Sequence, residues 1–127
     1  MHAHQLQEIN SRDWDDFCRR ISQQRQGAMT TIEMIGPDGI KTEKAGSATL
    51  ESMVLDTHGT CNSVISIRVR NNREITHEII DPIRVMLKQT GEQGEFNSVQ
   101  IEAENGTTLL AFHPAIHARM LEGLRVS

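Results

Sequence analysis

The chain has 127 residues, of which 37% are apolar and only 3% aromatic, and its net charge is −4. This length predicts a single domain, which we place at residues 10–124 after a flexible N-terminal segment over residues 1–9. The shortage of aromatic rings argues against a base-stacking surface, and the negative charge disfavours nucleic-acid partners.

The sequence contains no recognisable membrane segment or cysteine-based metal motif. It has no run of about eighteen apolar residues, and its start, Met-His-Ala-His, lacks the basic and apolar regions of a signal peptide. We therefore expect a cytoplasmic protein without membrane contact. Cys18 and Cys61 lie far apart in sequence and lack a metal-binding spacing, so we expect two unpaired buried thiols rather than a disulfide.

The first predicted element is a helix that Asn10 or Ser11 can cap and that Gly27 can stop. Its apolar residues follow the spacing of one helical stripe and are Trp14, Phe17, Cys18 and Ile21. Acidic residues near its start and arginines near its end complement the helix dipole. The acidic triplet, Asp13, Asp15 and Asp16, therefore needs no catalytic explanation.

After this helix the pattern changes to β structure. The sequence predicts strands over residues 28–35, 40–43 and 48–56, with a turn at Gly36-Pro37-Asp38-Gly39. A further turn is expected over residues 57–59. These short strands joined by tight turns are typical of an antiparallel sheet.

The most informative alternation lies between Ser63 and Ile80 and predicts a hairpin. A two-residue loop would place charged residues opposite apolar or like-charged ones, which is unfavourable. A three-residue loop, Asn71-Asn72-Arg73, instead predicts the pairs Val69–Ile75, Ile67–His77, Ile65–Ile79 and Arg70–Glu74. Asn72 tolerates the left-handed conformation that such loops need. This register turns His77 toward the interior.

The last third of the chain predicts two more elements of sheet and a helix. Pro82 ends the preceding strand, and Ile83, Val85 and Leu87 begin another. Asn105-Gly106 favours a type I′ turn with the pairs Ala103–Thr108, Ile101–Leu110 and Val99–Phe112. Pro114 then suits the first turn of a short helix, whose apolar stripe is Ile116, Met120 and Leu124.

Together these elements indicate an α+β, mainly β fold. We expect an N-terminal helix, then a curved antiparallel sheet or partly open small barrel of five to seven strands, and a short C-terminal helix.

His77 is the first candidate for a functional residue. A histidine among isoleucines can act as a ligand or an acid–base group in an apolar pocket, although a neutral core histidine bonded to a backbone carbonyl is the commoner arrangement. Asp81 is its nearest candidate partner, but the position of Asp81 before Pro82 is equally explained by turn chemistry.

Three arginines and two histidines complete the candidates. Arg68, Arg70 and Arg84 could attract an anion or an acidic partner, the alternative being solvated side chains paired with glutamates. His113 and His117 are four residues apart, a spacing that a divalent metal accepts on a helix. A single pair of this kind is a weak signal, and no complete catalytic or cofactor-binding motif is found.

Several features in order resemble a small uncharacterised bacterial family, the domain of unknown function with family number 5335. They are Trp14-x-x-Phe17, Gly27, His77-x-Ile79-x-x-Pro82 and Asn105-Gly106 followed by Leu109-Leu110-x-Phe112. The likeness spans roughly residues 10–113. It implies a short β-rich chain and no assigned activity. This chain departs from the family at Ala28 and Met29, where an aromatic residue is common.

We interpret the protein as a non-catalytic binding or assembly module without a cofactor. It would self-associate through an edge strand such as residues 83–88 or 40–43. One alternative is a small-ligand enzyme or sensor that uses His77. Another is a small Sm-like RNA-binding barrel, which the acidic net charge and the lack of aromatic residues disfavour.

Overall fold

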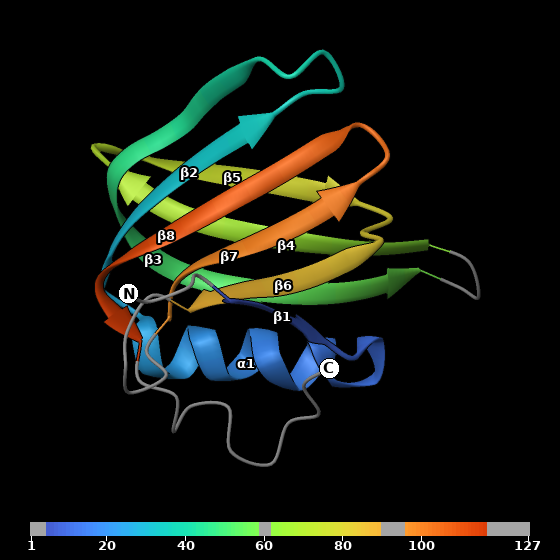
Figure 1. Ribbon diagram of the computed structural model, residues 1–127. Coiled ribbons are helices and arrows are strands. Elements are labelled where there is room, and N and C mark those ends of the chain that lie inside the picture. Colours follow the sequence, from blue (N-terminus) through green and yellow to red (C-terminus); the bar gives the residue numbers. More distant parts are fainter. Residues whose placement is uncertain (1–4, 59–61, 90–95, 117–127) are drawn as a thin grey trace.

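The computed structural model describes residues 5–58, 62–89 and 96–116, which form one helix, a short 3₁₀ turn and eight strands (Figure 1). The elements are β1 (Gln5–Ile9), η1 (Ser11–Asp13), α1 (Trp14–Arg25), β2 (Met29–Ile35), β3 (Lys41–His58), β4 (Asn62–Asn71), β5 (Arg73–Ile80), β6 (Arg84–Gln89), β7 (Phe96–Ala103) and β8 (Gly106–Ile116). All strands belong to one open antiparallel sheet with the order β1-β6-β7-β8-β2-β3-β4-β5. The predicted mainly β class is confirmed, but the sheet has more strands than the predicted five to seven.

Two stretches that the sequence did not assign to the sheet form part of it. Residues 1–9 were predicted as flexible, whereas Gln5–Ile9 form β1, pair with β6 and bury Ile9. The predicted C-terminal helix is wrong in its first turn, because β8 continues through Ile116. A strand can include Pro114 where its missing N–H is not needed by the ladder. The rest of that predicted helix, including Met120 and Leu124, lies outside the described residues.

Strand β3 also differs from its prediction, since the expected strands 40–43 and 48–56 are one continuous strand. Its pairing with β2 and β4 contains register shifts, and Ser47 has a positive φ of 48°. Such irregularities bend a strand strongly. One long bent strand therefore turns a corner of the sheet where the sequence predicted two short ones.

Helix α1 lies along one side of the curved sheet, next to β1 and β3 (Figure 1). The predicted apolar stripe of Trp14, Phe17, Cys18 and Ile21 is buried, and Asn10 caps the preceding 3₁₀ turn by accepting a hydrogen bond from the Arg12 N–H. The Trp14 indole donates to the Ile9 carbonyl oxygen at 3.1 Å. The Ser22 hydroxyl bonds both the N–H and the carbonyl oxygen of Met53 at 2.7 Å. These contacts fix α1 to β1 and β3.

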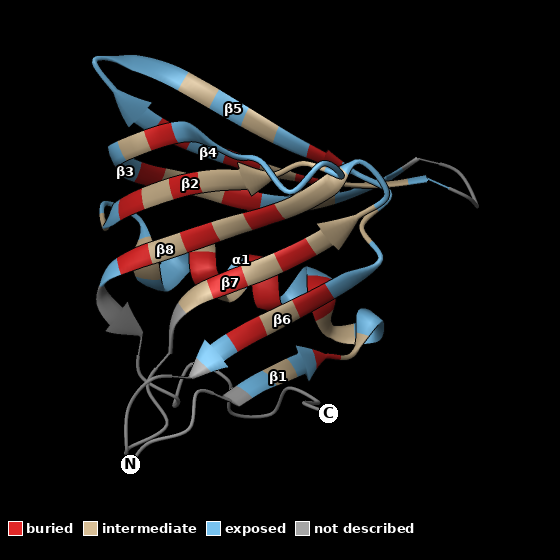
Figure 2. Cartoon of the chain, turned by 45° about the horizontal axis from the view of Figure 1, so that its top comes forward, coloured by how far each residue is buried: buried red, intermediate tan, exposed pale blue. Residues whose placement is uncertain are grey.

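The β4–β5 hairpin has the predicted register. Ile67 pairs with His77, Val69 with Ile75 and Arg70 with Glu74, and Asn72 has a φ of +66°. Buried positions alternate along the strands, as Figure 2 shows for β6, β7 and β8. The inner face of the sheet is therefore apolar, as period-two patterning requires.

The β7–β8 hairpin has a different register from the predicted one. Ala103 pairs with Gly106, Ile101 with Thr108 and Val99 with Leu110, so the loop is Glu104-Asn105. A type I′ turn needs positive φ at both loop residues, and neither Glu104 nor Asn105 has it. Because the register moves by two residues, each side chain stays on the predicted face.

Among the described residues, no helix combines the length and the apolar character needed to cross a bilayer.

Candidate functional site

The sheet curves so far that His77 on β5 contacts Thr108 on β8, four positions away in the strand order. The distance from His77 Nε2 to Thr108 Oγ1 is 3.0 Å, and Thr108 is only 2% exposed. Either atom can be the donor, depending on the histidine tautomer. Burial, and then the positive charge of Lys44, lower the pKa of His77 below its ordinary value. The imidazole is therefore neutral near pH 7.

This arrangement confirms that His77 faces inward and replaces its predicted partner. The Asp81 carboxylate accepts a hydrogen bond from the Ser63 N–H at 3.3 Å, and the Asp81 N–H donates to the Ser63 carbonyl oxygen at 2.7 Å. Asp81 has a φ of +51°, so it shapes the β5–β6 connection. The sequence paired His77 with Asp81, but the structure pairs it with Thr108.

We expect His77 to make the fold less stable in acid. The unfolded chain binds the His77 proton more readily than the folded chain, because the folded pKa is lowered; stability is therefore lost as the pH falls below about 6.5. The His77→Gln variant keeps a polar group near Thr108 but does not titrate. Urea unfolding between about pH 7.5 and pH 5 should show a smaller loss of stability in this variant than in the wild type. Equal losses would contradict the assignment.

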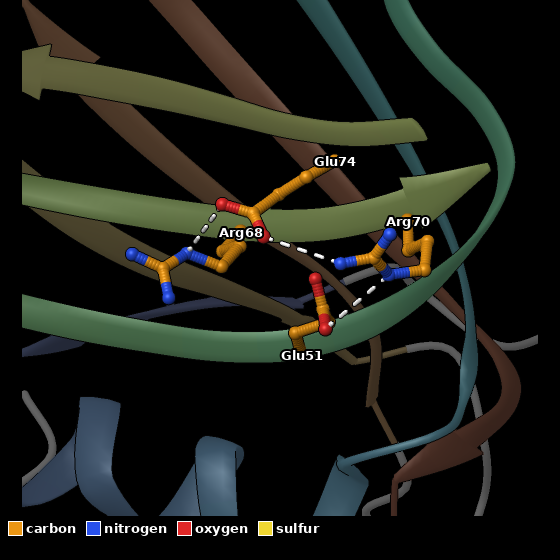
Figure 3. Close-up of polar contacts among 4 residues, drawn as sticks. All are labelled: Glu51, Arg68, Arg70 and Glu74. Carbon is orange, nitrogen blue, oxygen red and sulfur yellow. Dashed lines mark hydrogen bonds and ion pairs between the residues drawn. The ribbon is translucent and has the colours of Figure 1, made fainter. Parts of the chain in front are cut away.

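Arg68 and Arg70 lie on the outer face of β4 and are joined to glutamates (Figure 3). Glu74 on β5 bridges them, with 3.4 Å from its Oε1 to Arg68 Nε and 3.3 Å from its Oε2 to an Arg70 terminal nitrogen. Glu51 on β3 adds a 3.6 Å contact to Arg70 Nε. The two arginines are therefore neighbours, but carboxylates already neutralise much of their charge.

Arg84 is not part of this group. It lies on β6, where its Nε is 3.4 Å from Glu102 Oε2 on β7 and 4.0 Å from Glu8 Oε1 on β1. The three candidate arginines thus form two separate sets of exposed ion pairs. Exposed pairs of this kind contribute little energy, about 0–1 kcal/mol each. The structure favours the solvated, glutamate-paired arrangement over a single anion site.

The predicted metal site required His113 and His117 to lie on a helix, and the structure has no helix at His113. His113 lies on strand β8 instead of a helix, and His117 is outside the described residues. Within the described ranges, no three His, Cys, Asp or Glu side chains come together in a way that could hold a metal ion. Cys18 is a free buried thiol, and burial, together with the nearby Asp15 charge, raises its pKa to about 12. Cys61 also lies outside the described residues.

A pocket of about 620 Å³ lies where the β5–β6 connection meets the β7–β8 turn. Its lining residues are Ile80, Asp81, Ile83, Glu104 and Asn105. Ile80 and Ile83 are among the most exposed large apolar side chains, at 58% and 60%. Sequence patterns identified only Asp81 of this set. Ile80 could have indicated the pocket from the sequence. It occupies an outward position of a strand whose other outward residues are polar.

Strands β1 and β5 are the two ends of the sheet, and β5 is the longer one. Residues 83–88 were predicted as an edge, but β6 lies between β1 and β7. Residues 41–43 pair with β2, whereas the pairing of β3 with β4 begins only at Thr49. The predicted edge over 40–43 is thus open on one side in the part of the chain that the structure describes.

A family model described as "Family of unknown function (DUF5335)" matches residues 5–119. No curated protein and no solved structure matches the chain.

Proposed function

Since the chain belongs to the DUF5335 family, whose function is unknown, we propose from its geometry that it is a non-catalytic assembly module. Its strand β5 pairs with β5 of a second copy. The observation that carries this proposal is the open edge of β5, an eight-residue strand that pairs with β4 on one side and with no described strand on the other. Open strand edges are natural sites for pairing between chains.

The hydrogen-bond pattern identifies which backbone groups face this edge. Asp81 bonds Ser63 directly, and opposed residues in an antiparallel pair alternate between bonded and non-bonded positions. Ile79, His77 and Ile75 therefore direct their backbone groups toward β4. The N–H and carbonyl groups of the alternate residues, Glu74, Thr76, Glu78 and Ile80, face the open edge.

Charge favours the His77-centred register of two antiparallel β5 strands over the two adjacent ones. A twofold axis at His77 places Thr76 opposite Glu78 and Glu74 opposite Ile80, without like charges in opposition. An axis at Thr76 would oppose Glu74 and Glu78, and an axis at Glu78 would oppose that residue to its own copy. The His77-centred register also covers the half-buried Ile75 with Ile79 of the second copy. The contact consists of one pair of short strands. It supports a weak dimer, with a dissociation constant on the order of 10–100 µM.

The Thr76→Pro variant tests the proposal. Proline removes an N–H that faces the open edge, and edge strands tolerate proline at such positions. We expect this variant to fold and to remain monomeric in sedimentation equilibrium, at concentrations where the wild type dimerises.

The matched control is Thr76→Val, which keeps the N–H and suits a strand. It should dimerise like the wild type. A wild-type chain that stays monomeric up to about 1 mM would refute the proposal, since that affinity is too weak for assembly. Dimerisation of Thr76→Pro at wild-type strength would refute the use of this edge.

The alternative functions receive less support. The His77 ring is engaged with Thr108, and a ring nitrogen in that contact is less accessible to a substrate. The three candidate arginines, which an RNA-binding surface would need, are paired with glutamates.

A further inference from the structure

The pocket beside Asp81 is acidic and apolar. The described residues that line it include two carboxylates, Asp81 and Glu104, and no basic side chain. Glu104 is exposed and has no hydrogen-bond or ion-pair partner among the residues that the structure describes. Exposed Ile80 and Ile83 supply the apolar part. The complementary group is a cation on an apolar stem, and the arginine side chain has this chemistry.

Arg73 is the corresponding unpaired arginine on β5. It is exposed at the start of the strand, and no carboxylate in the described part of the chain lies within ion-pair distance of it. Arg68 and Arg70, on the neighbouring strand, both have such partners. Arg73 therefore has a charge that no described carboxylate compensates within the monomer.

The proposed dimer register brings these two features together. With the twofold axis at His77, Arg73 of the second copy stands opposite Asp81. Directly opposed residues project from the same face of a sheet, so this arginine shares the face of His77. That face looks toward β8, because His77 bonds Thr108. The β7–β8 turn, which carries Glu104, is on this side and forms the other wall of the pocket.

We propose that the pocket is the receptor for Arg73 of the second copy, which enters between Asp81 and Glu104. This inference rests on the proposed dimer and adds to it the group that fixes its register. Each dimer contains the contact twice. The stem of the arginine packs on Ile83, and the guanidinium faces the carboxylates.

Charge reversal and exchange test this contact without altering the β5 backbone. The Arg73→Glu and Glu104→Arg variants should each dimerise at least about tenfold more weakly than the wild type, because each places like charges at two symmetric contacts. The double variant Arg73→Glu/Glu104→Arg restores opposite charges and should recover most of the affinity. The matched control is Arg12→Glu, which makes the same charge change at an exposed position in η1, away from β5.

Sedimentation equilibrium at low and high salt measures all five proteins, and circular dichroism confirms that each is folded. The wild type should lose affinity with added salt, since the contact is charged. Dimers whose affinity is unchanged by either reversal would overturn the Arg73 contact and leave the β5 dimer standing. A double variant no stronger than the single ones would also overturn the contact. A monomeric wild type would overturn this contact and the dimer together.

Discussion

Replacing Phe17 with alanine is expected to lower the free energy of unfolding by about 3–5 kcal/mol, the range for removing a buried phenylalanine side chain. Phe17 is fully buried on α1, and the same face carries Trp14 and Ile21, which are also buried. The helix lies against β3 and is held by the Ser22–Met53 hydrogen bonds, so it cannot easily move to fill the space. Urea unfolding monitored by circular dichroism would measure the loss.

The control for this variant is Gln24→Ala on the exposed side of the same helix. Surface substitutions of this kind change stability by about 0.5 kcal/mol or less, and alanine is a good helix former. If Phe17→Ala were no more destabilising than Gln24→Ala, α1 would not form part of the hydrophobic core. The helix would then contribute little to the stability of the sheet.

Local patterns predicted the parts of this fold in which neighbours in sequence are also neighbours in space. The β4–β5 register followed from alternation together with the charges at Arg68 and Arg70, and the structure has the same pairs. The buried stripe of α1 followed from helical spacing. In both cases the decisive contacts lie within one element or across one tight loop.

Predictions failed where distant segments decide the structure. Strand β1 exists because β6 pairs with it, about eighty residues later in the chain. Among its described side chains, Ile9 is fully buried but Leu6 is exposed, so β1 carries too little alternation to mark a strand. The order of the eight strands is likewise set by pairings such as β2 with β8, which no local pattern reveals.

In the candidate site, too, local patterns predicted the orientation of side chains but not their contacts with distant segments. Strand parity predicted correctly that His77 points inward, but its partner Thr108 is 31 residues away. Arg68 and Arg70 come together because they alternate on one strand, whereas Arg84 lies on another part of the sheet with different partners. The pocket beside Asp81 needs Glu104, which the pairing of β6 with β7 and the bond from the Ile83 N–H to the Glu102 carbonyl oxygen bring near. A site built by sheet curvature could not be read from spacing alone.

Gly106 lies at the corrected register of the last hairpin, and its replacement is expected to lower the stability of the fold strongly. The sequence assigned this glycine to the loop, but it is the first residue of β8, with a φ of +142°. A Cβ atom there would lie 2.6 Å from the Ile35 carbonyl oxygen and 2.9 Å from Met34 Cε. The glycine thus allows β8 to approach the end of β2, a contact that the expected loop position does not require.

The Gly106→Ala variant should therefore lose about 2–5 kcal/mol of stability, from backbone strain and a steric clash with a main-chain oxygen. The matched control is Gly39→Ala. Gly39 also has a positive φ, +82°, but a Cβ atom added there would meet no other atom within 4 Å, so only the left-handed cost of about 1–2 kcal/mol applies. Denaturant unfolding of both variants separates the cost of the steric clash from the cost of the backbone conformation. Equal losses would mean that β2 does not approach Gly106 closely, and the packing of β2 on β8 at this corner would have to be looser than the structure has it.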